Sequence, residues 1–178
     1  MIDDILAYSS LVQKQDPECI SLQKILNETT ELLDQAIKDK KAVIHSDRLP
    51  EINVVPSQFG QLFQNLISNS LKFSRKDVPP EIDITHQFLN SQQVNGAANN
   101  STTKYLQLQF RDNGIGFEQK DAEKIFDLFK RLHTRQEYAG TGIGLAIVKK
   151  VVENHKGFIS AQSEGEKGAL FRIILPVN

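Results

Sequence analysis

The chain has 178 residues, of which 39% are hydrophobic and 24% are charged, and its formal net charge at pH 7 is −1. This balance argues against a basic nucleic-acid-binding protein and against electrostatic attraction to an anionic membrane surface. No apolar run approaches the ~20 residues of a membrane helix, and a single cysteine can form neither an intrachain disulfide nor a cysteine-based metal site, so a cytoplasmic domain is expected.

The N-terminal residues are expected to lie outside the main domain. Ile2, Ile5 and Leu6 recur at helical spacing, which is typical of the last turns of a helix. Pro17 ends that pattern, because the residue before a proline is disfavoured in a helix. We therefore predict a helix remnant and linker over residues 1–16 and one domain over residues 17–178.

The next third of the chain predicts two helices and two strands. An amphipathic pattern from Leu22 to about Lys41 predicts a single helix. The β-rich runs 42–46 and 51–55 are separated by a short turn and are expected to pair with each other. A second helix is expected to open at Pro56, with Ser57 as its N-cap, and to continue to about Phe73.

The second half of the chain alternates strands with loops and one helix. The predicted elements are a strand at 81–89, a polar surface loop at 90–104 without capacity to pack, a strand at 105–112, a helix at about 142–154, and strands at 157–163 and 169–176. Helices and strands are interleaved, but several connections have the length of a hairpin. This combination favours an α/β (α+β) two-layer sandwich: a mixed β-sheet with helices packed on one face.

One helix carries an unusual polar stripe. Asn65, Asn69 and Lys72 are spaced i, i+4 and i+7, so they share a face of the predicted helix 56–73. Asparagine is a mediocre helix former, and a lone one is most simply an exposed or locally satisfied amide. Three polar groups on one stripe favour a binding face instead. Amide oxygens suit Mg²⁺ that bridges nucleotide phosphates, and a lysine can hold a phosphate as a point charge.

Two glycine segments add to this interpretation. The segment "DNGIGF", residues 112–117, follows a strand and is either an ordinary turn or a base-binding turn. In the second case Asp112 accepts a hydrogen bond from the exocyclic amino group of adenine, where guanine presents an acceptor, so the site selects ATP over GTP.

The segment "GTGIGLAIVKK", residues 140–150, places glycines directly before a helix. Free N–H groups at a helix start make a phosphate cradle, although a glycine-rich linker is the simpler alternative. The spacing fits neither a Walker motif nor a Rossmann motif.

Taken in order, the segments "NLISNSLKFS", "DNGIGF", "IFDLFKRL", "GTGIGLAIVKKVVENHKG" and "SEGEKGALFRIILP" resemble the catalytic and ATP-binding domain of sensor histidine kinases, which are Bergerat-fold ATPases. The resemblance covers residues 17–178 nearly end to end. It implies a Bergerat fold, ATP and Mg²⁺ as cofactors, and transfer of the γ-phosphoryl group to a histidine of the dimerisation domain. A response regulator would then be the downstream partner.

The resemblance also implies roles for individual residues. Asn65 and Asn69 would coordinate Mg²⁺, and together with Lys72 they would form the catalytic set. Phe73 would lie next to adenine, although a core phenylalanine is the alternative. Phe126, Phe129 and Arg131 match the start of an ATP lid over residues 130–139. The implied nucleotide-binding residues are Asn65, Asn69, Lys72, Phe73, Asp112, Gly114, Ile115, Gly116, Phe117, Arg131, Gly140, Thr141, Gly142, Ile143, Gly144 and Leu145.

Asn65 separates this chain from the hydrolytic members of the superfamily. Gyrase-like, mismatch-repair and chaperone ATPases resemble one another in carrying a glutamate there, which acts as a general base. A neutral amide cannot take a proton near neutral pH, so we expect poor hydrolysis of bound ATP.

The phosphoacceptor histidine is expected to lie elsewhere. The chain has four histidines, His45, His86, His133 and His155, and none stands in the sequence context of a kinase phosphoacceptor. We therefore expect a histidine supplied by another segment or chain, upstream of Met1 in the parent protein. A nucleotide-binding regulatory module without phosphotransfer is the alternative.

Overall fold

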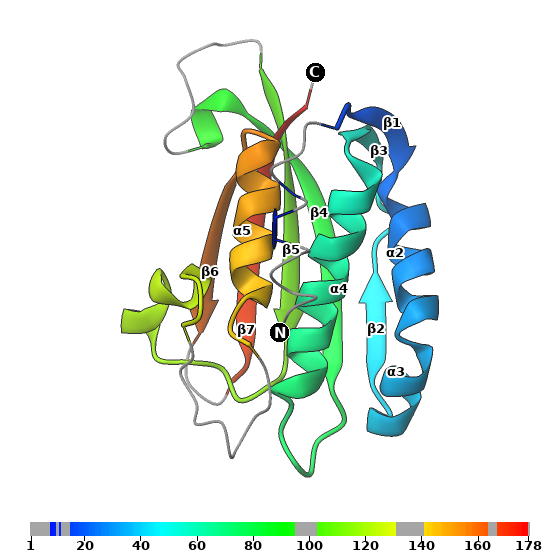
Figure 1. Ribbon diagram of the computed structural model, residues 1–178, viewed down its shortest axis with the longest axis vertical. Helices are drawn as coiled ribbons and strands as arrows, with labels where there is room; N and C mark the ends of the chain where they lie inside the picture. Colours follow the sequence, from blue (N-terminus) through cyan, green and yellow to red (C-terminus); the bar gives the residue numbers. More distant parts are fainter. Residues whose placement is uncertain are drawn as a thin grey trace.

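The computed structural model describes residues 8, 9, 11, 15–94, 103–130, 141–163 and 167–177. Its helices and strands are β1 Glu18–Ser21, α2 Leu22–Leu32, α3 Asp34–Lys40, β2 Val43–Ser46, β3 Glu51–Val54, α4 Pro56–Lys72, β4 Glu81–Asn90, β5 Lys104–Asp112, α5 Gly144–Asn154, β6 Phe158–Ser163 and β7 Ala169–Val177 (Figure 1). Short 3-10 helices are η1 Ser91–Gln93, η2 Gln119–Asp121 and η3 Lys124–Phe126. Within the described ranges, no helix has the length and apolar character needed to cross a membrane.

The main sheet has five strands in the order β2-β4-β5-β7-β6. The β2–β4 pair is parallel and the other pairs are antiparallel, so the sheet is mixed. Strands β1 and β3 form a separate antiparallel pair. Helices α4 and α5 lie side by side over one face of the main sheet (Figure 1). The predicted mixed sheet with helices on one face is confirmed.

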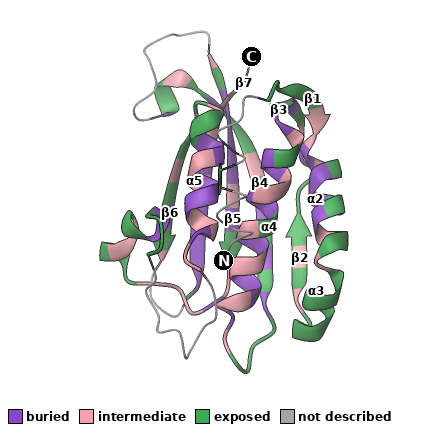
Figure 2. Ribbon diagram, in the orientation of Figure 1, coloured by how far each residue is buried: buried purple, intermediate pink, exposed green. Residues whose placement is uncertain are grey.

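The core lies between that sheet face and the helices, as the buried stripes of α4 and α5 show (Figure 2). In α4 the apolar residues recur at helical spacing and are almost fully buried: Phe59, Leu62, Phe63, Leu66 and Ile67. Burying each such side chain stabilises the fold by about 1.5–3 kcal/mol. This packing fixes the rotation of α4, so its polar stripe has a fixed orientation relative to the sheet.

Two predictions in the first third of the chain are wrong. The single helix expected from Leu22 to Lys41 is two helices that meet at Leu33, whose ψ of 6° departs from helical geometry. The side chains of Thr29 and Thr30 donate to carbonyl oxygens of their own helix, which bends helices. The strands β2 and β3 do not pair with each other. Strand β3 pairs with β1, which lies inside the predicted domain at residues for which no strand was expected, and β2 pairs with β4.

Two local predictions also need correction. Helix α4 starts with Pro56 and has Val55 as its N-cap, with no capping side chain, while the Ser57 hydroxyl donates to the Gln15 side chain at 2.7 Å. The loop after β4 was expected to have no capacity to pack. Its first residues form η1, and Val94 is buried against Leu89 and Tyr105.

Candidate functional site

The polar stripe of α4 lies against the first residue of α5. A Cβ added to Gly144 would lie 2.8 Å from Asn65 Oδ1 and 3.9 Å from Asn69 Nδ2. Asn65 Nδ2 donates to the carbonyl oxygen of Gln61 at 2.7 Å, which fixes the amide orientation. Both asparagines remain partly exposed. The predicted amide pair and the predicted glycine-rich helix start are therefore brought together, and a Cβ at position 144 would force the Asn65 side-chain oxygen to move.

Lys72 and Phe73 form the next part of the site. Lys72 Nζ lies 4.5 Å from the centroid of the Phe73 ring, which is within cation–π distance. Both residues are partly exposed. The ammonium group predicted for phosphate and the aromatic ring predicted for adenine thus lie next to each other at the end of α4.

Asp112, at the end of β5, is held by three donors. Its Oδ1 accepts the backbone N–H groups of Gly114 at 2.9 Å and Ala169 at 3.1 Å. Its Oδ2 lies 3.1 Å from the Ser70 hydroxyl of α4. Burial raises the pKa of this carboxyl above its ordinary value, and the three hydrogen bonds act in the opposite direction. The hydrogen bonds favour the ionised form, which is the acceptor that an exocyclic amino group requires.

The turn after Asp112 is fixed to the end of α4. The Ile115 N–H donates to the Phe73 carbonyl oxygen at 2.9 Å. A Cβ on Gly114 would come within 2.6 Å of that same oxygen, so glycine is needed for the close approach. Gly116 has a φ of 65°, and the Phe117 N–H donates to Ser163 Oγ at 2.9 Å. The structure therefore joins Phe73, Asp112 and the predicted base-binding turn in one place.

Helix α5 starts without a side-chain cap. Among the described residues, the N-cap residue Ile143 makes no side-chain hydrogen bond to the helix start, and the first turn of α5 contains no acidic residue. Uncapped N–H groups together with the positive end of the helix dipole suit a phosphate. The Ile143 side chain is 1% exposed and belongs to the core, so a contact from Ile143 to a nucleotide would use its backbone. Leu145 is partly buried and packs against the same core.

The segment that leads toward α5 is joined to the segment that follows η3. Gly142 has a φ of 75°, and its carbonyl oxygen accepts the Phe129 N–H at 3.0 Å. Phe129 itself has a φ of 62° and a side chain that is 60% exposed. Phe126 is instead buried and packs edge-on against Phe171. The predicted site residues Arg131 and Gly140, and most of the predicted lid, lie outside the described residues.

The described residues fit a magnesium nucleotide. Two amide side chains offer hard oxygen ligands, a lysine offers positive charge, and an uncapped helix start offers N–H donors. Because Gly144 has no Cβ, the Asn65 amide oxygen can lie close to the start of α5. Asp112 supplies a carboxylate acceptor at the other end of the arrangement. The set combines groups for phosphate, metal and base.

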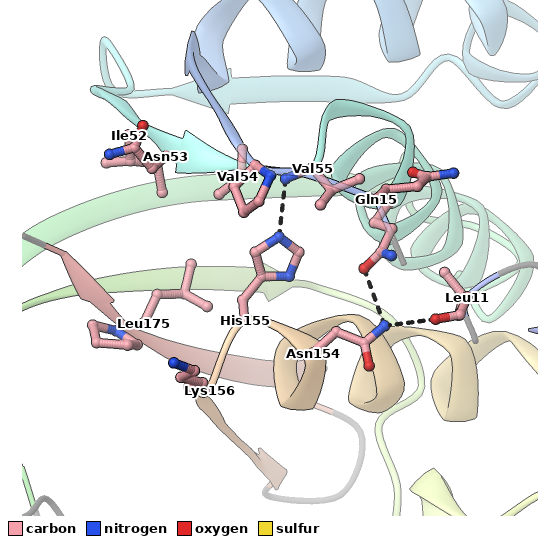
Figure 3. Close-up of a pocket in the computed structure, with 13 residues that line it drawn as sticks. Leu11, Gln15, Ile52, Asn53, Val54, Val55, Asn154, His155, Lys156 and Leu175 are labelled. Atoms are coloured by element: carbon pink, nitrogen blue, oxygen red, sulfur yellow. Dashed lines mark hydrogen bonds between the residues drawn. The ribbon is translucent and has the colours of Figure 1, made fainter. Parts of the chain in front are cut away.

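A cavity of about 510 Å³ lies at the opposite end of the α4–α5 pair, around His155 (Figure 3). His155 Nε2 accepts the Val55 N–H at 3.0 Å, and Nδ1 lies 2.7 Å from the Val151 carbonyl oxygen. Asn154 Nδ2 donates to the Leu11 carbonyl oxygen and to the Gln58 side chain. These bonds give His155 a structural role and hold residue 11 to the domain.

Sequence reasoning missed three residues that support Asp112. Ser70 and Ala169 donate to its carboxylate, and Gly168, with a φ of 89°, packs against its backbone carbonyl so closely that a Cβ would overlap it. A serine at a core position of α4 was a usable signal. The contribution of residues 168 and 169 depends on β7 lying beside β5, which the local sequence does not reveal.

Comparison with known proteins identifies similar chains. A family model described as "Histidine kinase-, DNA gyrase B-, and HSP90-like ATPase" matches residues 54–178. Cyanobacterial phytochrome A of a Nostoc species is 40% identical over 182 residues, covering 99% of this chain and 21% of the relative. Sensor protein kinase WalK of Staphylococcus epidermidis is 29% identical over 185 residues, covering 99% of this chain and 28% of the relative. The chain spans 21% and 28% of the length of these two relatives.

Solved structures share the fold. Full-length ShkA in complex with AMPPNP has a TM-score of 0.75 and 21% identity, with 99% of this chain and 35% of that chain covered. The catalytic domain of the histidine kinase ThkA, in a nucleotide-free form, has a TM-score of 0.71 and 18% identity, with 92% of this chain and 97% of that chain covered. These likenesses confirm the predicted fold class.

Proposed function

The chain belongs to the family of histidine kinase-, DNA gyrase B- and HSP90-like ATPases, and we propose that it binds Mg-ATP and transfers the γ-phosphoryl group to a histidine of a sensor kinase's dimerisation domain. The main support is the arrangement around the C-terminal half of α4, where an amide pair, a lysine, a partly buried carboxylate and an uncapped helix start lie together. The sandwich is the Bergerat fold expected from the sequence.

Each group has a distinct role in this proposal. Oxygens of Asn65 and Asn69 hold the metal, which neutralises phosphate charge when bound. Lys72 and the first N–H groups of α5 hold phosphate oxygens. Asp112 accepts the exocyclic amino group of adenine, and Ile115 packs against the base. In the transfer, the bond between the γ-phosphorus and its bridging oxygen breaks while a phosphorus–nitrogen bond forms with the acceptor imidazole.

Asn65 supports transfer over hydrolysis. Its Nδ2 donates to the Gln61 carbonyl, and the amide cannot accept a proton from water near neutral pH. The chain therefore holds ATP without a general base at this position. We propose that the γ-phosphoryl group is retained until an acceptor histidine arrives.

The decisive experiment mixes this domain, γ-labelled ATP, Mg²⁺ and a dimerisation segment of the parent kinase. The expected product is phosphohistidine on the segment, labile in acid and stable in base. Asn69→Ala should abolish the signal, whereas the exposed-site variant Asp83→Asn on β4 should keep it.

Two results would contradict the proposal in different ways. Normal ATP affinity without transfer to any segment would favour a nucleotide-binding regulatory module. Rapid steady-state release of inorganic phosphate, with no labelled segment, would favour a hydrolytic ATPase of the gyrase kind.

The partners and location follow from the same proposal. The direct partner is the dimerisation and histidine phosphotransfer domain, and a response regulator receives the phosphoryl group from it. We place the domain in the cytoplasm because that compartment supplies ATP. The boundary at residues 16 and 17 remains a prediction.

A further inference from the structure

The hydroxyl of Ser70 lies between two acceptors. Its Oγ is 3.1 Å from the Leu66 carbonyl oxygen and 3.1 Å from Asp112 Oδ2. The residue is 8% exposed and follows Asn69 directly on α4. It therefore connects the helix that carries the amide pair to the carboxylate at the end of β5.

A serine hydroxyl has one hydrogen and can donate to only one of these acceptors at a time. The two distances are equal, so distance does not favour either acceptor. The carboxylate of Asp112 carries charge and is the stronger acceptor. The hydrogen of Ser70 is therefore directed at Asp112 Oδ2.

This bond completes a three-point support of the carboxylate. Two backbone N–H groups, from Gly114 and Ala169, hold Oδ1, and they leave Oδ2 to be positioned by Ser70. A carboxylate oxygen has two lone pairs, so Oδ2 retains one for a second donor. We propose that Ser70 is a positioning residue that orients Asp112 Oδ2 toward the exocyclic amino group of adenine. This inference rests on the proposed ATP binding.

A purely structural role for Ser70 is the competing explanation. Serine inside a helix commonly donates to the carbonyl oxygen four residues earlier. Ser74, just after α4, provides the matched comparison: its hydroxyl donates to the Leu71 carbonyl oxygen at 2.9 Å, and the residue is 7% exposed. Ser74 thus bonds a backbone carbonyl three residues earlier, where Ser70 reaches one four residues earlier, and its burial is similar. Among the described residues, the Ser74 hydroxyl makes no hydrogen bond to the Asp112 carboxylate.

The test compares two nucleotides that differ by one group. ATP and purine riboside triphosphate, which lacks the 6-amino group, are titrated with Mg²⁺ into the wild type, Ser70→Ala and Ser74→Ala. We expect Ser70→Ala to weaken ATP binding about fivefold to tenfold and to change the binding of the purine analogue by less than about twofold. Ser74→Ala should leave the ratio of the two affinities unchanged. Alanine favours the helix, and circular dichroism checks the fold of both variants.

The outcomes separate this inference from the proposed function. If Ser70→Ala leaves ATP affinity unchanged, strengthens it, or weakens both nucleotides equally, Ser70 does not position the base-reading oxygen. If the wild type itself does not prefer ATP over the purine analogue, the adenine contact of Asp112 is wrong. If the wild type binds neither nucleotide, the proposed function fails.

Discussion

Among single residues, Asp112 shows how an unfavourable burial is offset locally. Removing a carboxylate from water raises its pKa, because desolvation penalises the charged form. Two backbone N–H groups and one hydroxyl compensate for part of that loss. Such a group is costly for folding and useful for recognition, since a charged acceptor in a partly dry site discriminates strongly between a donor and an acceptor on the base.

Asp112→Asn should weaken ATP binding by about 1.5–3 kcal/mol, which is roughly a tenfold to hundredfold rise in Kd. An asparagine side chain has only one acceptor oxygen, and its NH₂ group is a donor. In the variant this NH₂ group would face either the protein donors that hold Asp112 or the adenine amino group, and in both cases a donor would face a donor. Isothermal titration with ATP and GTP measures the change, and discrimination against GTP should fall as well. An unchanged Kd for ATP, with Asp83→Asn as the surface control, would show that Asp112 does not read the base.

At the scale of elements, α4 carries both the core and the site. One of its faces buries large apolar side chains, and the neighbouring stripe presents the amides to α5. Two glycines, Gly60 inside α4 and Gly144 at the start of α5, have different surroundings. A Cβ at Gly60, inside α4, would meet nothing within 4 Å, whereas one at Gly144 would press on the end of the Asn65 side chain.

This difference predicts opposite consequences for two Gly→Ala substitutions. Gly60→Ala should stabilise the domain by about 0.5–1 kcal/mol without changing ATP affinity, because alanine restricts the unfolded chain. Gly144→Ala should change stability little, since a side-chain tip can move, but it should weaken Mg-ATP binding by about tenfold as Asn65 is displaced. Urea unfolding and titration measure both effects. Equal nucleotide affinity in the two variants would contradict the placement of Asn65 in the site.

His155 joins three elements at the opposite end of the helix pair. It follows α5, accepts the Val55 N–H before α4, and packs edge-on against Phe59 with ring centroids 5.0 Å apart. Burial lowers its pKa below the ordinary value of 6.5, and the bond to the Val151 carbonyl opposes this in part. Protonation would also replace the Nε2 acceptor with a donor facing another donor. Neutral His155 is thus the form that the fold holds.

The expected consequence is a loss of stability in mild acid. Because the folded-state pKa is lower than the unfolded one, the unfolded chain binds more protons, and the contribution of His155 is complete above pH 6.5 and declines as the pH falls toward the folded-state pKa. Urea unfolding between pH 5 and 8 should show this decline, and His155→Gln should flatten it. Asp112 has a raised pKa, so its contribution to stability falls as the pH rises above about 3.8, which is the opposite direction. Both proteins contain Asp112, so the difference between the wild-type and His155→Gln profiles reports on His155 alone. A wild-type profile parallel to that of the variant would refute this assignment.

Helices and strands with strong periodicity could be predicted from the sequence, but the pairing of strands could not. Strands β4, β5 and β7 and helix α5 agree with the predicted segments because their alternating or helical patterns are clear. The partner of β3 was missed because β1, with its burial pattern of exposed and half-exposed residues, has no clear alternation. Pairing between distant segments depends on tertiary contacts, which no local pattern encodes.

For the whole molecule, nucleotide binding should appear as stability. A ligand that binds the folded state alone adds RT ln(1 + [L]/Kd), which is about 2.7 kcal/mol at one hundred times Kd. Mg-ATP should therefore raise the Tm, while GTP at the same concentration, or ATP with excess chelator, should raise it much less. Asn69→Ala tests that the increase depends on the amide pair. An equal rise with GTP would contradict base selection by Asp112.

Most residues of the candidate site could be predicted from sequence motifs, but the residues that hold the Asp112 carboxylate in place could not. Asparagines at helical spacing and two glycine segments pointed to one region, and the structure places Asn65, Asn69 and Gly144 together, with Phe73 and Asp112 at the same turn. Ile143 was predicted in the site although its side chain is core. Ala169 could not be predicted because a hydrogen bond across elements has no sequence pattern of its own, whereas a serine at a core position of α4 was a signal for Ser70 that did not name its partner.

The bond between the Phe129 N–H and the Gly142 carbonyl oxygen holds together two described segments that are not contiguous in the sequence. The entropy cost of closing a connection rises only slowly with the length of that connection. Changes of sequence length between these two residues should therefore leave the sheet and its helices in place.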